Sequence, residues 1–194
     1  MKRSRLAVVA IVAAVLSVGG LDVASAATLA PTSSQGAQAK NPHESLSFLG
    51  MANIAVSRVR ALYPDAELLE GQGKSPAGST DDVTDITEWR FIFRLPGNRT
   101  ATIQSTGWGA FSAPVVVDQP WLGDQKIEWS PENFLGIREA DDRLTDAGYT
   151  DAFKSITFRA PLYPGIDEPY YIFNFTDGSH IAVGVIDGEV VPFH

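Results

Sequence analysis

A weak internal repeat constrains the fold of this chain more than any other sequence feature. The sequence Phe-Leu-Gly at residues 48–50 recurs at 134–136, and Phe-Ile-Phe at 91–93 is similar to Tyr-Ile-Phe at 171–173. Self-similarity of this kind predicts a duplicated supersecondary unit, whose copies stack because neither buries enough apolar surface alone. The alternative is that two unrelated helix-plus-hairpin stretches share a similar composition.

Each half begins with a helical pattern. Apolar residues recur at near-helical spacing between Leu46 and Leu62, and Pro64 is expected to end this first helix. In the second half, residues 130–133 (Ser-Pro-Glu-Asn) form a typical helix start, and Gly148 stands where a left-handed residue often closes a helix. The sequence therefore predicts one helix in each half.

Alternating strands follow each helical pattern. Residues 89–95 alternate between large apolar and mostly polar side chains, which predicts a strand with one buried and one largely wet face. The turn residues 96–98 lead into a second strand. The runs 171–175 and 181–185 repeat this alternation on either side of Asp-Gly at 177–178, a dipeptide that favours a hairpin.

The predicted fold class is α+β, with two repeated helix-plus-antiparallel-sheet units at residues 43–129 and 130–194 packed as one body. This arrangement of residues 44–194 resembles the PepSY-like family and related secreted bacterial inhibitors of the β-lactamase-inhibitory type. The segments 171–175 and 187–190 are most similar to the family's strand-turn-strand ending. The resemblance implies a helix lying on an antiparallel sheet, often as a duplicated unit.

The N-terminal residues predict export. Residues 1–26 contain a basic start, an apolar run and the ending Ala-Ser-Ala, which together are typical of a secretory signal peptide. A membrane anchor is the alternative, but the apolar run is only about a dozen residues, short of the ~20 needed to cross a bilayer. Residues 27–42 are rich in small and polar side chains and are expected to form a flexible leader. The predicted location is therefore extracellular, without a membrane span.

Charge and cysteine content exclude several function classes. The chain has 23 acidic and 15 basic residues, a formal net charge of −8 and no cysteine. Loss of residues 1–26 makes the charge still more negative. Because such a surface repels phosphate backbones, nucleic-acid binding is not expected, and a cationic partner or surface would be attracted instead. Without cysteine the fold has no disulfide, and the chain offers neither a thiol nucleophile nor a thiolate metal ligand.

No motif for catalysis or cofactor binding is evident in the sequence. The histidines have no metal-ligand spacing, no Gly-x-Ser-x-Gly elbow is present, and His180 is expected to face outward or into a shallow groove. Residues 71–75 (Gly-Gln-Gly-Lys-Ser) lack the rest of a phosphate-binding loop and are interpreted as a flexible loop between two strands. The acidic clusters at 81–88 and 139–146 are interpreted as solvated faces, with calcium binding as an alternative for the first. No cofactor is expected.

Aromatic residues outside the regular elements are the candidate binding residues. Trp108 lies at the tip of a predicted hairpin, where little core exists to bury its ring. Phe111 and Trp121 belong to the stretch that follows, which has no counterpart in the second half, and Tyr163 lies in a later loop. Rigid aromatic rings are frequent anchors in binding interfaces, although tryptophan is also common in cores.

These features favour a secreted, non-enzymatic binding module, such as an inhibitor or accessory protein, whose partner is an extracellular protein or polysaccharide. One alternative is a small secreted hydrolase that draws its acid or base from Asp141, Asp142 or His180. The other alternative is a carbohydrate-binding or cell-wall-binding module, in which Trp108 and Trp121 stack on sugar rings.

Overall fold

The computed structural model describes residues 47–107, 109–162 and 168–193. The predicted signal peptide (1–26) and leader (27–42) lie outside these residues. The helical elements are α1 (Phe48–Leu62), α2 (Ile137–Asp146) and two short 3-10 turns, η2 (Val83–Asp85) and η3 (Pro131–Asn133). The strands are β1 (Glu67–Lys74), β2 (Glu88–Leu95), β3 (Arg99–Gly107), β4 (Ala110–Phe111), β5 (Val115–Val117), β6 (Asp124–Gln125), β7 (Phe153–Pro161), β8 (Tyr170–Phe175), β9 (His180–Gly184) and β10 (Val190–Pro192).

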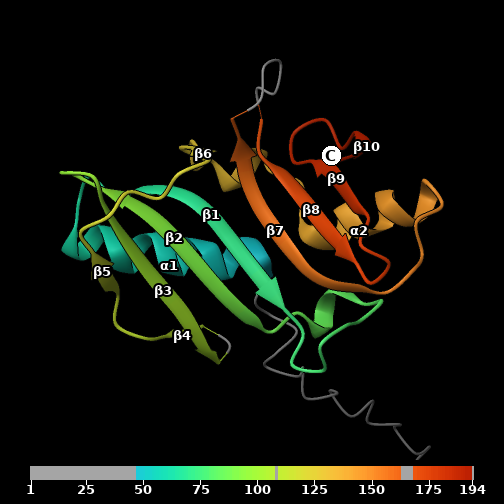
Figure 1. The fold of residues 1–194 in the computed structure, drawn as a ribbon, viewed down its shortest axis with the longest axis horizontal. Helices are drawn as coiled ribbons and strands as arrows, with labels where there is room; N and C mark the ends of the chain where they lie inside the picture. Colours follow the sequence, from blue (N-terminus) through green and yellow to red (C-terminus); the bar gives the residue numbers. More distant parts are fainter. Residues whose placement is uncertain (1–46, 108, 163–167, 194) are drawn as a thin grey trace, which may run out of the picture. The chain divides into compact units, whose positions relative to one another are not determined.

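These strands form one antiparallel sheet (Figure 1). Its order is β10-β9-β8-β7-β1-β2-β3-β4, with β5 paired to β3 and β6 paired to β7. At its centre β1 pairs with β7, so that Glu70 lies opposite Arg159 and Gly73 lies opposite Ile156. Backbone hydrogen bonds between β1 and β7 therefore join the strands of the first half of the sequence to those of the second half in one continuous sheet.

The predicted fold class, two repeated helix-plus-antiparallel-sheet units, is wrong. The observed architecture is a single ten-stranded antiparallel sheet with two short helices. The difference arises at β1 and β7, two strands that the sequence patterns did not reveal. Residues 71–74, interpreted as part of a flexible loop, belong to β1, and their bonds to β7 fuse the two predicted sheets into one.

Glycines explain why β1 is hard to recognise from its sequence. Glycine is disfavoured in strands, so Gly71 and Gly73 argue locally against one. In the structure, a Cβ atom at Gly73 would lie 2.5 Å from Cη2 of Trp89, and one at Gly71 would lie 3.1 Å from Cε1 of Phe91. The missing side chains thus make room for two aromatic rings of the neighbouring strand.

Both helices pack against the same face of the sheet. From α1, the ring of Phe48 lies 4.7 Å from Trp89, 5.0 Å from Phe158 and 5.3 Å from Tyr171, as measured between ring centroids. From α2, Ala140 and Leu144 join the same buried cluster, and Figure 1 shows both helices behind the sheet. The main buried cluster therefore lies on one side of the sheet, and neither described helix covers the other side.

The first predicted helix agrees with the structure, whereas the second differs in where it begins. The first helix is confirmed, because α1 ends at Leu62, just before Pro64. The second begins later than predicted, since residues 131–133 form only a 3-10 turn and α2 starts at Ile137. The reason is Phe134, whose extended backbone interrupts the helix while its ring packs 5.7 Å from that of Trp129. The left-handed cap at Gly148 is confirmed by its φ of 93°.

The start of α1 provides a first test of the structure. The Oγ atom of Ser47 accepts a hydrogen bond of 3.2 Å from the amide of Gly50. Ser47→Ala is expected to lower the free energy of unfolding by about 1 kcal/mol, because an N-terminal amide loses its partner. Urea denaturation measures this loss. As a control, Ser57→Ala on the exposed side of α1 should change stability by less than about 0.5 kcal/mol, and a loss as large as that of Ser47→Ala would contradict the capping role.

Among the described residues, no helix has the length and apolar character that a bilayer crossing requires.

Candidate functional site

The sheet face opposite the helices is the candidate binding surface, which we call the open face. Because successive strand residues point to opposite sides, the strands that bury aromatic rings on one side display polar side chains on the other. The register aligns Gln104, Arg90, Gln72 and Thr157 in one row across β3, β2, β1 and β7. The side chains that define the open face are those of Glu70, Gln72, Lys74, Arg90, Ile92, Arg94, Thr102, Gln104, Thr157 and Arg159.

A cavity of about 450 Å³ opens on this face over β1, β2 and β3. We call it the β1–β3 cavity. Its lining combines two cations, one carboxylate, two amides, a hydroxyl group and part of a tryptophan. The lining residues are Gln72, Lys74, Glu88, Trp89, Arg90, Gln104 and Ser105.

The cations of the open face fall into two groups. Arg94 pairs with Glu67 and Arg159 pairs with Asp124, each at 3.3 Å. Within the described part of the chain, Lys74 and Arg90 form no ion pair. The cations that line the β1–β3 cavity are therefore the two of the open face that form no ion pair, although Glu88 lines the cavity beside them.

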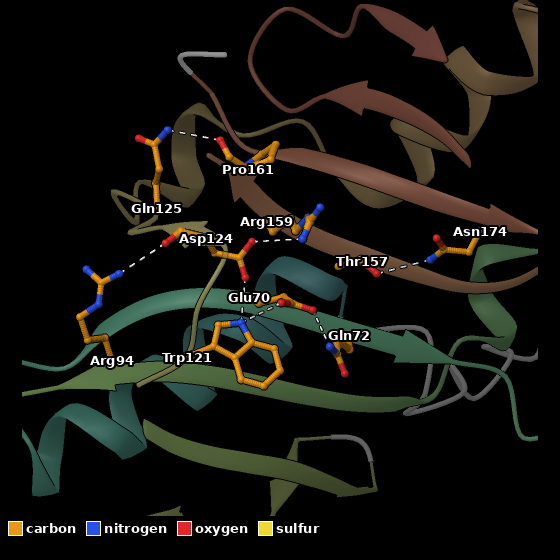
Figure 2. Close-up of polar contacts among 10 residues, drawn as sticks. All are labelled: Glu70, Gln72, Arg94, Trp121, Asp124, Gln125, Thr157, Arg159, Pro161 and Asn174. Carbon is orange, nitrogen blue, oxygen red and sulfur yellow. Dashed lines mark hydrogen bonds and ion pairs between the residues drawn. The ribbon is translucent and has the colours of Figure 1, made fainter. Parts of the chain in front are cut away.

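A buried carboxyl pair lies beside the cavity. Glu70 and Asp124 are only 4% and 3% exposed. The indole Nε1 of Trp121 donates to both, at 3.2 Å to Glu70 Oε2 and 2.8 Å to Asp124 Oδ2, as Figure 2 shows. Gln72 donates from Nε2 to Glu70 Oε1 and accepts at its own Oε1 from Arg90. A hydrogen-bonded chain thus connects the buried pair to the cavity.

Burial and the neighbouring carboxyl group change the titration of Glu70. Desolvation acts most strongly and, with the hydrogen bond to Asp124, raises the pKa of Glu70 to about 7. The hydrogen bond from Gln72 and the positive charge of Arg159 act in the opposite direction. Two adjacent buried carboxylates are costly to ionise together, so the pair retains a proton near neutral pH.

The segment that carries Trp121 and Asp124 crosses one end of the open face. We call residues 118–127 the strap. The carbonyl of Gln119 accepts a 2.7 Å bond from Thr100 Oγ1, and the amide of Ile127 donates to the carbonyl of Leu68 at 2.8 Å. Together with Trp121, these bonds hold the strap on the sheet and leave the β1–β3 cavity at its side.

The residues predicted from the sequence occupy different environments. Phe111 is 8% exposed and packs 6.0 Å from the ring of Phe91, with the Arg58 guanidinium 5.9 Å from its own ring. It belongs to the core cluster. Trp121 is half-buried in the strap, where its indole is engaged by the carboxyl pair. Trp108 and Tyr163 lie outside the described residues.

Sequence reasoning missed the cavity residues for an identifiable reason. The alternation of residues 89–95 did indicate that Arg90 lies on a wet face. It did not show what lies beside Arg90, because Gln72 and Lys74 belong to the unrecognised strand β1. Only the register of β1 against β2 brings these side chains together.

The remaining candidates from the sequence are the calcium site at residues 81–88 and the acid–base residues His180, Asp141 and Asp142. The described residues contain no group of three or more metal-ligating side chains. His180 is exposed, as predicted, and its Nδ1 lies 2.8 Å from Asn174 Oδ1. The two acidic clusters approach each other where α2 meets η2, and desolvation, followed by the charges of Asp82, Asp142 and Asp81, raises the pKa of Asp141 to about 6.

Comparison with known proteins assigns neither a family nor a function to the chain. The resemblance of residues 44–194 to the PepSY-like family is therefore an inference from sequence patterns alone. No protein-family model, no curated protein and no solved structure matches the chain.

Proposed function

We propose that this chain is an extracellular, non-enzymatic binding module that holds a macromolecular partner against the open face. The observation that carries this proposal is the β1–β3 cavity, in which Lys74 and Arg90 are without an ion-pair partner in the described residues. An inhibitor or accessory protein would act in this way, by occupying the surface of another molecule. The predicted signal peptide at residues 1–26 supports a partner outside the cell.

The architecture suits such a role because the cavity side chains stand on strands rather than on loops. Strands β1, β2 and β3 are hydrogen-bonded side by side, and their other face is covered by core residues such as Phe91 and Ile103. A rigid support lowers the conformational entropy that side chains lose on binding. Polar lining is also common in interfaces that form and dissociate.

The buried carboxyl pair adds no catalytic site to the hydrolase alternative, which draws its acid or base from Asp141, Asp142 or His180. Paired carboxyl groups are a frequent catalytic arrangement, but they must reach both the substrate and a water molecule. Glu70 and Asp124 are almost fully covered, and their oxygens are engaged by Trp121, Gln72 and Arg159. This arrangement supports a structural role that anchors the strap.

A variant that fills the cavity tests the proposal. Gln104 is an exposed lining residue, and Gln104→Trp is expected to weaken partner binding at least ~tenfold by occupying the cavity. The partner is first captured from the producer's culture fluid and identified, and its dissociation constant is then measured with purified proteins. Ser57→Trp on the exposed side of α1 is the matched control and should bind as the wild type does.

Equal binding by the Gln104→Trp and Ser57→Trp variants would contradict a role for the open face. Trp108→Ala and Tyr163→Ala test the remaining predicted aromatic anchors in the same assay. Turnover of generic ester, peptide or glycoside substrates that His180→Ala abolishes would instead favour the hydrolase alternative.

A further inference from the structure

The β1–β3 cavity carries excess positive charge in an acidic protein. Lys74 and Arg90 line it together with Glu88, which lies opposite Lys74 in the β1–β2 register, whereas the whole chain has a net charge of −8. A hollow with low-dielectric walls concentrates the field of the charges that line it. The cavity is therefore a local site for an anionic group.

Arg90 is already positioned to receive a carboxylate. One of its terminal nitrogens donates to Gln72 Oε1, and Gln72 is held in turn by Glu70. Among the described residues, no other hydrogen bond engages the Arg90 guanidinium. A planar guanidinium with free N–H groups binds a carboxylate through two parallel hydrogen bonds. The bond to Gln72 orders the side chain before a ligand arrives.

The spacing of the two cations selects the form of the ligand. Arg90 lies opposite Gln72, and Lys74 is two residues further along β1, so the cations are diagonal neighbours on one face. Such neighbours in an antiparallel pair are ~7–8 Å apart. Alternate side chains of an extended peptide are spaced by about 7 Å along its axis. Two acidic residues separated by one residue therefore match the two cations.

We infer that the β1–β3 cavity binds an extended acidic segment of a protein partner, with carboxylates at positions i and i+2 contacting Arg90 and Lys74. This inference rests on the proposed function and names the chemistry of the partner at the same site. The spacing matches an extended peptide, and the test includes a uronate polysaccharide as a competing ligand.

Peptide titrations of the purified full chain test the inference. The probe is a short peptide with blocked ends that contains Asp-Gly-Asp, and amide chemical shifts give the dissociation constant. We expect shifts at residues 72–74, 88–90 and 104–105. A peptide with Asn-Gly-Asn should produce none, and one with adjacent aspartates should bind several-fold more weakly than the probe.

Charge variants then assign the two contacts. Arg90→Gln and Lys74→Gln should each weaken binding about tenfold, because each removes one charged hydrogen-bond donor. Glu88→Gln should strengthen binding, because it removes the carboxylate opposite Lys74. Arg138→Gln on the exposed surface of α2 carries the same charge change away from the cavity and should leave the dissociation constant unchanged.

Three results would overturn the inference. They are equal binding of the Asp and Asn peptides, equal weakening by Arg138→Gln and Arg90→Gln, and tighter binding of a uronate oligosaccharide than of the acidic peptide. The outcome is separable from that of the proposed function. If Gln104→Trp abolishes capture of the partner while no acidic peptide binds, the carboxylate assignment fails and the open-face function stands.

Discussion

Phe48→Ala is expected to lower the free energy of unfolding by about 3–5 kcal/mol, a large part of the 5–15 kcal/mol typical of a whole domain. Phe48 is 3% exposed, and its ring contacts Trp89 from β2, Phe158 from β7 and Tyr171 from β8. The substitution therefore leaves a cavity between α1 and strands from both halves of the sequence. Urea denaturation followed by tryptophan fluorescence measures the loss.

Leu62 provides the control for this substitution. It is also in α1 but is 63% exposed, so Leu62→Ala should cost less than about 1 kcal/mol. If Phe48→Ala does not fold, Phe48→Leu retains part of the packing and should show an intermediate loss. Similar losses at positions 48 and 62 would mean that Phe48 does not hold α1 on the sheet.

Glu70→Gln is expected to abolish a pH dependence of stability between pH 4.5 and about 7. In the folded protein, burial and Asp124 raise the pKa of Glu70 from its ordinary value of 4.5 to about 7. Between these values the folded protein holds a proton that the unfolded chain releases, so the free energy of unfolding falls as pH rises. The contribution is fully present below pH 4.5, and its loss above pH 7 amounts to up to about 3 kcal/mol.

The glutamine variant is uncharged at every pH, as Glu70 is in its protonated state. Its single amide oxygen can accept from Trp121 Nε1, but the acceptor that Glu70 Oε1 offers to Gln72 Nε2 is lost, which lowers stability by the same amount at every pH. The stability of the variant relative to the wild type should therefore increase by up to about 3 kcal/mol from pH 5 to pH 8. Glu132→Gln at an exposed position controls for the removal of a negative charge. A difference between Glu70→Gln and wild type that is the same at both pH values would refute this account.

Local sequence patterns predicted the hairpins correctly because a hairpin depends only on residues that are close together in the sequence. The alternation within residues 89–95 and the Asp-Gly turn at 177–178 describe strands that pair with their immediate neighbours in the chain. The pairing of β1 with β7 depends instead on residues that are distant in sequence. Gly71 and Gly73 fit β1 because of the rings of Phe91 and Trp89, and no pattern within β1 itself contains that information.

The candidate site shows the same division. Single-strand alternation places Arg90 on the open face, but the cavity exists only because β1 supplies Gln72 and Lys74 beside it. The selection of aromatic residues outside regular elements as binding residues was less informative. It could not distinguish a ring that contacts a partner from one that packs or hydrogen-bonds within the protein. Phe111 packs against Phe91, and Trp121 donates to two buried carboxyl groups, whose burial depends on the strap.

The junction between β1 and β7 has a consequence for biosynthesis. During translation, β1 emerges long before the segment that will cover its second edge. Until then, the backbone amides and carbonyls on the β7 side of β1 have no strand partner, and such an edge is a template for pairing with other chains. A product truncated before residue 153 would thus be an aggregation-prone fragment rather than a functional half-protein, because the central ladder forms only after β7 has been synthesised.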